Sequence, residues 1–421
     1  MKKTLLLFII LTVSYGYSQD VTLTTQAEVD EYVGGDVIGN LSIGLGGGSD
    51  ITTLANLSLI TSVTGFVWIH ENPILVNLSG LDNLLTITGD LYLQDNPVTT
   101  SLTGLGGLTS VANFYYARNS TLSNLIGLGD LMNVGGYFWI ENNTGLNSFS
   151  GLNMLNSITG LVYINNNDAL TSFTGLESLV IIDGYFYALG NDNVSLIDFT
   201  GFNALTSVGT SFTIESNNNI TSLNGFDALS SVGTTFDIST NAELTSLNGI
   251  ESLITISANG GTSGFQIDAN PKLTDISGMV NVDHTKISTL TIRNNTLLVT
   301  CEISNICTYL NIPGASIIFG NAIGCETSTE ILAACATASV SNYLLKMAVS
   351  IYPNPTSDLL NIKIINDLIV EKVSLYAMDG RLIKEQKYQL QSIDISDVAV
   401  GIYNLRIESD KGIINTRIVK Q

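Results

Sequence analysis

The chain has 421 residues, of which 45% are hydrophobic and 13% charged, so it is long enough for more than one folded domain. Its 37 acidic residues outnumber its 16 basic residues, and the formal net charge at pH 7 is −21. Such a charge repels phosphate backbones and anionic membrane surfaces, so we expect no nucleic-acid partner.

The first 18 residues have the pattern of a signal peptide. Two lysines precede an apolar run over residues 5–13, and small residues follow around 14–18. The run is too short to span a bilayer as a helix, and no other stretch approaches the roughly 20 apolar residues that a span needs. We therefore expect export without a transmembrane span, with an N-terminal membrane anchor as the alternative.

The acidic residues are unevenly distributed. Residues 19–348 contain 28 acidic and 5 basic residues, a net charge of −23, whereas residues 349–421 contain nine of each. This difference predicts two domains.

A repeat of about 24 residues occupies most of the first part. Each repeat has a glycine followed by an apolar residue, then a leucine four positions after the glycine and a β-branched residue seven positions after it. The glycines are Gly80, Gly104, Gly127, Gly151, Gly175, Gly201, Gly225, Gly249 and Gly278. This spacing predicts a solenoid, and less regular coils near residues 37–43, 63–69 and 287–292 bring the expected number to about eleven.

Each coil continues into a short alternating segment, as at 138–140, 162–164 and 212–214. Alternation indicates a strand with one face in the core. We expect the strands to stack in parallel about 4.8 Å apart, forming a right-handed parallel β-solenoid roughly 50 Å long. Inward pairs should compensate in size, as Tyr115 with Ala117 and Phe186 with Ala188. A short helix over 24–33 is expected to close the N-terminal end.

An asparagine column follows the strands. Its members are Asn72, Asn96, Asn143, Asn167, Asn191, Asn217, Asn241, Asn270 and Asn295. Asparagine tolerates left-handed backbone geometry at a bend, and its amide can bond to the neighbouring coil. A structural ladder explains all of them together, so it is favoured over metal or sugar binding, and we expect no metal or cofactor.

The outward strand positions are rich in aromatic residues. The middle position is assigned to Trp68, Tyr92, Tyr116, Trp139, Tyr163 and Tyr187, and the position two residues earlier to Phe66, Phe114, Tyr137 and Tyr185. An exposed aromatic patch of this extent predicts binding of an extracellular glycan or protein. The alternative is a β-ladder that only stabilises a structural spacer, and exposure of the rings in the folded protein would favour binding.

No residues form a recognisable catalytic motif. The two histidines, His70 and His284, are expected at the surface and belong to no metalloprotease or triad pattern. Glu215 and Asp237 fall on adjacent expected strands, roughly 8 Å apart, which is near the carboxylate separation of inverting glycosidases. Neither has an evident partner to raise its pKa, so we expect a non-enzyme, with polysaccharide hydrolase or lyase activity as a weaker alternative.

Four cysteines, Cys301, Cys307, Cys325 and Cys335, lie within 35 residues. An exported chain favours two local disulfides over a zinc site, because the spacing lacks paired C-x2-C knuckles. Three pairings remain open. This segment, 301–335, is expected to cap a solenoid domain spanning 19–300, and residues 336–348 read as a linker.

The tail, 349–421, has strand-like runs at 359–364, 372–376, 393–395 and 402–407, separated in part by turn signals. The pattern predicts a small antiparallel β-sandwich.

Residues 20–335 resemble bacterial receptor L-domain-like solenoids, which are related to leucine-rich repeats. The resemblance is carried by the phrase Leu205-x-x-Val208, then Phe212-x-Ile214-x-x-Asn217, by the opening 26–43 and by the closing segment 320–325. The chain departs from the pattern at Asn56, where a glycine is expected, and at 259–261, which suggest a bulging loop.

The tail resembles type IX secretion sorting domains. The matching residues are Tyr352, Pro353, Asn354, Pro355, Gly380, Gly401, Tyr403 and Lys420. The resemblance implies recognition by the type IX secretion machinery, passage through the outer membrane and removal of the tail, with the remainder released or anchored at the surface. A carbohydrate-binding β-sandwich is the alternative for this domain.

Overall fold

The computed structural model describes residues 19–44, 46, 48–256, 264–312, 315–336, 349–364, 369–377, 381–388, 390–410 and 412–421. The chain divides into two compact units, Met1–Ser328 and Thr329–Gln421. The expected signal peptide, the loop at 259–261, nearly all of the linker and Gly380 lie outside the described residues.

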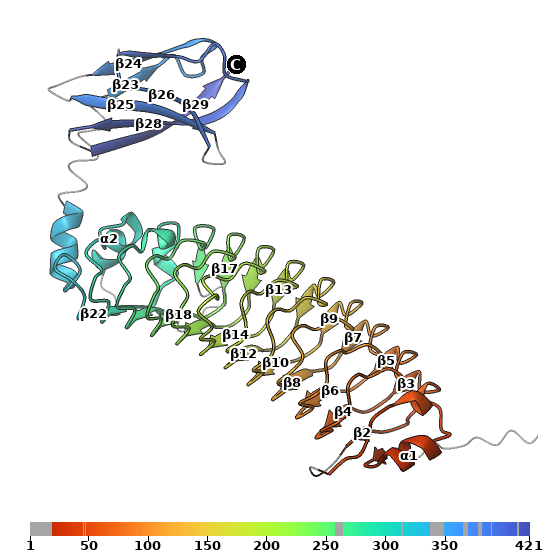
Figure 1. The fold of residues 1–421 in the computed structure, drawn as a ribbon. Helices are drawn as coiled ribbons and strands as arrows, with labels where there is room; N and C mark the ends of the chain where they lie inside the picture. Colours follow the sequence, from red (N-terminus) through yellow and green to blue (C-terminus); the bar gives the residue numbers. More distant parts are fainter. Residues whose placement is uncertain are drawn as a thin grey trace, which may run out of the picture. The chain divides into compact units, whose positions relative to one another are not determined.

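The first unit is a parallel β-solenoid whose main sheet has thirteen strands in chain order. They are β1 (Val21–Leu23), β2 (Leu41–Ile43), β4 (Val67–His70), β6 (Leu91–Gln94), β8 (Phe114–Ala117), β10 (Phe138–Glu141), β12 (Val162–Asn165), β14 (Phe186–Leu189), β16 (Phe212–Glu215), β18 (Thr235–Ser239), β20 (Gly264–Asp268), β21 (Thr289–Arg293) and β22 (Ala315–Phe319). Each pairs in parallel with the strand one coil away, as expected. About twelve turns therefore form the solenoid, along which the strands succeed one another in Figure 1.

Two-residue strands form a second parallel ladder on the coils. One sheet contains β7 (Ser110–Val111), β9 (Asn133–Val134), β11 (Ser157–Ile158), β13 (Ile181–Ile182), β15 (Ser207–Val208), β17 (Ser231–Val232) and β19 (Thr255–Ile256), and another pairs β3 (Ser62–Val63) with β5 (Thr86–Ile87). The second residue of each strand is the repeated β-branched residue, and it is buried. Each repeat therefore contributes one strand to the main sheet, through its alternating segment, and one strand to the second ladder, through its β-branched residue.

The solenoid core is filled by the repeated leucines, which are fully buried, and by stacked phenylalanines. Phe149, Phe173 and Phe199 stack in successive coils with ring centroids 5.9 and 5.1 Å apart. Offset stacking of this kind adds to the stability gained from burying the rings. The expected inward pair Phe186 and Ala188 is confirmed, since both are buried.

Short helices occur near both ends of the stack. Helix α1 (Gln26–Glu31) confirms the expected N-terminal helix, and Thr25 with Glu28 forms its capping box. Toward the other end lie α2 (Ser304–Leu310) and the 3-10 turns η2 (Ser277–Met279) and η3 (His284–Lys286). A further helical segment spans 328–336. The turn η1 (Ala55–Leu57) contains Asn56, where the repeat lacks its glycine.

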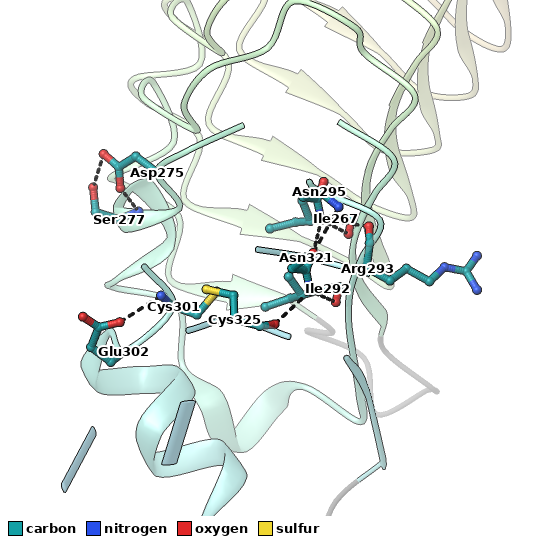
Figure 2. The surroundings of a disulfide bond; sticks show 10 residues. All are labelled: Ile267, Asp275, Ser277, Ile292, Arg293, Asn295, Cys301, Glu302, Asn321 and Cys325. Carbon is teal, nitrogen blue, oxygen red and sulfur yellow. Dashed lines mark hydrogen bonds between the residues drawn. A yellow bond between two sulfur atoms is a disulfide. The ribbon is translucent and has the colours of Figure 1, made fainter. Parts of the chain in front are cut away.

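The cysteines are oxidised, as expected. Cys301 is bonded to Cys325, and Cys307 and Cys335 are also disulfide-bonded, so none of the four is free. Figure 2 shows the first bond beside Asn321, whose Nδ2 donates to the carbonyl oxygens of Cys325 (3.0 Å) and Ile292 (2.8 Å). The disulfide thus cross-links two segments that are 24 residues apart, and one of its cysteines is hydrogen-bonded to Asn321.

The second unit contains two antiparallel sheets. One has β23 (Val349–Tyr352), β24 (Leu359–Ile364) and β27 (Ser392–Asp394), and the other has β26 (Leu382–Gln386), β25 (Val370–Ala377), β28 (Gly401–Ser409) and β29 (Gly412–Lys420). Both sheets contribute to one core that includes Leu360, Ile393, Leu405 and Ile418. This arrangement confirms the expected antiparallel sandwich.

Candidate functional site

The outward face of the main sheet carries a row of aromatic side chains, but one coil differs from the sequence-based assignment. Trp139 pairs with Tyr115, which points outward, whereas Phe114 and Tyr116 are 0% and 1% exposed in the core. Both were expected outside, and Tyr115 was expected inside. The coil from Gly104 to Gly127 is one residue shorter than the usual 24. Core packing places Phe114 in register with the buried residues Leu91 and Phe138 of the neighbouring strands.

The corrected row borders an open groove of about 870 Å³. Its lining residues are Phe66, Trp68, Tyr92, Gln94, Asn113, Tyr115, Gly136, Tyr137, Trp139, Glu141, Gly160, Leu161, Gly184 and Tyr185. They come from β4 to β14 and from the segments that lead into these strands. The structure therefore brings together the expected residues Phe66, Trp68, Tyr92, Tyr137, Trp139 and Tyr185, and Tyr163 and Tyr187 continue the same row.

Stacked glycines keep part of this groove open. A Cβ atom on Gly160 would lie 2.7 Å from the backbone of Gly136, and a Cβ atom on Gly184 would lie 2.6 Å from the carbonyl carbon of Gly160. These separations are too short for a side chain without backbone movement. The successive coils can therefore approach closely here, and no side chain from these positions fills the groove.

Neighbouring rings in the row contact one another. The ring centroids are 6.0 Å apart for Tyr92 and Tyr115, 6.3 Å for Tyr115 and Trp139, and 4.1 Å for Trp139 and Tyr163. Most of the rings are half-buried, and Tyr185 is 43% exposed. Packing within the row thus restricts the rings while leaving part of their surface open to solvent.

Tyrosine hydroxyls at the groove are held by acidic and amide side chains. The hydroxyl of Tyr92 donates to Asp90 at 2.6 Å and lies 2.8 Å from the hydroxyl of Tyr137. Asn113 donates to the other oxygen of Asp90 and accepts from the backbone N–H of Tyr137, both at 2.6 Å. This network links three successive coils and fixes the rings that border the groove.

A second link involves Tyr115, whose hydroxyl donates to Glu141 at 2.7 Å. Burial raises the pKa of Tyr115, and the hydrogen bond to Glu141 raises it further, so the hydroxyl stays protonated at neutral pH. Arg118 approaches this hydroxyl, but its guanidinium forms a two-pronged ion pair with Asp95 at 2.8 and 2.7 Å. Glu141 is the only charged residue that lines the groove in the described part of the chain.

His70 lies beside this row and is 2% exposed, so its expected surface position is wrong. Its ring stacks on Trp68 with centroids 3.6 Å apart. Burial lowers the pKa of His70, which favours the neutral imidazole at pH 7. His284 is half-buried in η3.

The acidic pair Glu215 and Asp237 lies on adjacent strands with the expected offset of two positions. Burial raises the pKa of Asp237, with a further contribution from Glu215, so the expectation that Asp237 has no partner to raise its pKa is wrong. Gln266 donates to Asp237 at 3.2 Å. Both acids lie beyond the aromatic rows, and neither lines the groove.

The asparagine column forms a buried ladder that also includes Asn119 and Asn321, which were not among the expected members. Asn167 is typical: its Nδ2 donates to the carbonyl oxygens of Ile140 and Asn165, and its Oδ1 accepts from the backbone of Asn143. Left-handed geometry occurs one residue earlier, as at Asn166 (φ 53°), and not at the ladder residue. Among the described residues, no group of three or more His, Cys, Asp or Glu side chains is placed to hold a metal ion.

Residues of the expected sorting motif hold the ends of the tail together. Asn354 donates to the carbonyl oxygen of Arg417 at 2.8 Å and accepts from the N–H of Val419 at 2.9 Å. Tyr403 donates to the carbonyl oxygen of Ala399, and Lys420 is buried at the end of β29. Tyr352 is exposed.

Comparison with known families identifies residues 350–421 as a secretion system C-terminal sorting domain. This match confirms the type IX assignment of the tail. A search of curated proteins finds no significant match. Within the described residues, no helix is both long and apolar enough to cross a membrane.

Proposed function

Because the chain carries a type IX sorting tail and is thereby a secreted or cell-surface protein, we propose that its solenoid is a non-catalytic binding module and that the aromatic groove is its ligand site. The tail provides delivery through the secretion machinery, and the solenoid provides recognition outside the cell. The acidic surface of the solenoid makes nucleic acid an unfavourable ligand.

The observation that carries this proposal is the open groove bordered by aromatic rings from consecutive coils. Apolar area contributes about 25 cal/mol per Å² when it is removed from water, so a ligand covering these rings gains affinity from their surface. The rings are already restricted by mutual contacts and by the Asp90 and Glu141 hydrogen bonds. Binding therefore costs little additional side-chain entropy.

The competing function is a structural spacer in which the rings only stabilise the sheet. Ring contacts such as that of Trp139 with Tyr163 favour this alternative, because each cross-strand aromatic pair contributes about 0.2–1 kcal/mol to stability. Hydrolase or lyase activity has weaker support, since the pair Glu215 and Asp237 does not line the groove.

A triple variant, Trp68→Ala with Trp139→Ala and Tyr163→Ala, tests the binding function in the full chain. Binding is measured on purified cell-surface material and on glycan and protein arrays, and folding is checked by circular dichroism. We expect ligand retention to fall strongly in the triple variant. Tyr388→Ala, which removes an 84% exposed ring from the tail, is the aromatic control and should bind as the wild type. Equal binding by all three proteins would establish the rings as structural.

A further inference from the structure

The row of rings runs across the strands, along the axis on which the coils stack. Successive coils contribute Trp68, Tyr92, Tyr115, Trp139, Tyr163 and Tyr187, one ring each. The five steps between β4 and β14 correspond to about 24 Å at the usual strand spacing. A surface that repeats one chemical group per coil is complementary to an extended ligand that also repeats.

The row has defined ends. In register with the rings, the preceding position is Ser42 and the following positions are Thr213 and Asp237. These side chains offer no aromatic face. The stacking surface is therefore limited to six coils, which sets a maximum length of ligand that the rings can cover.

The groove combines apolar faces with neutral hydrogen-bonding groups. Gln94 and Asn113 supply amides, and the hydroxyls of Tyr92, Tyr115 and Tyr137 can accept bonds from a ligand while donating within the protein. Sugar rings present C–H faces that pack on aromatic rings and hydroxyls that both donate and accept. The groove therefore matches the two kinds of surface that a polysaccharide presents.

Charge narrows the ligand class further. No lysine or arginine lines the groove in the described part of the chain, and nearby Arg118 is neutralised by Asp95. Glu141 contributes a carboxylate instead. An anionic polymer would meet like charge without a cationic partner, which disfavours its binding.

We propose that the groove binds an uncharged polysaccharide whose chain lies along the coil axis. This inference rests on the proposed binding function and specifies its ligand. A protein partner is the alternative occupant, but protein interfaces concentrate their affinity in a few central side chains, whereas these rings are distributed over six coils.

The test uses the full chain and isothermal titration calorimetry with uncharged β-glucan, mannan and chitin oligosaccharides, from disaccharide to octasaccharide. We expect at least one series to bind, with affinity rising by about tenfold or more with length until the oligosaccharide spans about 24 Å. Polygalacturonate and alginate are the anionic comparison and should bind at least about tenfold more weakly than the best uncharged polymer. The length series needs no substitution and so does not depend on a variant folding.

Single variants at the two ends test the orientation. Trp68→Ala and Tyr187→Ala should each weaken binding of the octasaccharide while sparing that of a trisaccharide held at Trp139 and Tyr163, and Tyr388→Ala should change neither. Preference for anionic polymers, or an affinity that does not grow beyond the disaccharide, would overturn the inference. If the triple variant instead loses binding to a protein and no oligosaccharide binds, the groove is a binding site but the polysaccharide assignment is wrong. Absence of any ring-dependent ligand contradicts both proposals.

Discussion

The ladder asparagines satisfy buried backbone groups that the coils leave without partners. Asn167 is fully buried and bonds to both its own strand and the coil before it. Its Oδ1 also accepts from the backbone N–H and the Nδ2 of Asn143, at 3.2 and 3.0 Å. Each ladder residue therefore supports its neighbours as well as its own turn.

Replacing one ladder residue should destabilise the solenoid. Asn167→Ala leaves buried donors and acceptors unpaired, so we expect the free energy of unfolding to fall by about 2 kcal/mol or more, measured by urea denaturation. Asn165→Ala, two residues earlier on the outward face, is the matched control and should have little effect. Equal stability of the two variants would mean that water replaces the lost amide.

The raised pKa of Asp237 predicts that the stability of the solenoid depends on pH. Because burial raises its pKa in the folded state, its contribution to stability is fully present below the ordinary pKa of aspartate, about 3.9, and is lost as pH rises through the folded value. Asp237→Asn stays neutral, so its melting temperature should exceed that of the wild type at pH 7, and the difference should disappear at low pH. Asp130→Asn, at an exposed position, controls for the removed charge. A constant difference at all pH values would contradict the assignment.

At the scale of the coil, a glycine and a short second strand determine how closely successive turns approach. Gly175 has a φ of +109°, and a Cβ atom there would collide with the carbonyl group of Phe149 in the preceding coil. Equivalent glycines adopt similar angles throughout the regular coils, from +107° at Gly249 to +129° at Gly201. The repeated glycine is thus required both by its backbone conformation and by the contact between coils.

Gly175→Ala should therefore lower the stability of the solenoid by about 2 kcal/mol or more, because it combines backbone strain with overpacking. Gly129→Ala is the control, since its added Cβ would meet no atom within 4 Å. Thermal and urea unfolding of the two variants give the comparison. A Gly175→Ala protein as stable as the control would show that the coils can separate locally without cost.

At the scale of the whole molecule, the two parts of the chain differ in charge. Acidic residues dominate residues 19–348, whereas the tail is balanced. The sorting domain has its own core, and Asn354 joins the start of this domain to its last strand. The tail is therefore a compact unit with a core of its own.

Mature protein recovered from outside the cell should begin near Gln19 and end before about Val349. We expect the N-terminal segment to act as a signal peptide that is removed on export, and the sorting tail to be removed on passage through the outer membrane. Intact-mass and peptide mass spectrometry of culture supernatant and outer membrane measure both ends. A chain lacking residues 350–421 serves as control and should remain in the periplasm. Full-length protein at the cell surface would contradict removal of the tail.

Strand-like runs separated by turn signals indicated the sandwich of the tail. Sequence periodicity by itself determined the β-solenoid, the buried leucines and most of the asparagine column, because each depends on spacing that repeats along the chain. It could not determine which face Phe114, Tyr115 and Tyr116 occupy, since three consecutive aromatic residues satisfy either phase of the strand. Packing against Leu91 and Phe138 decided that phase. Tertiary structure alone also raised the pKa of Asp237, because that effect depends on burial and on Glu215 in the neighbouring coil. The groove arises in the same way, from rings and glycines that are about 24 residues apart in sequence and become adjacent only when the coils stack.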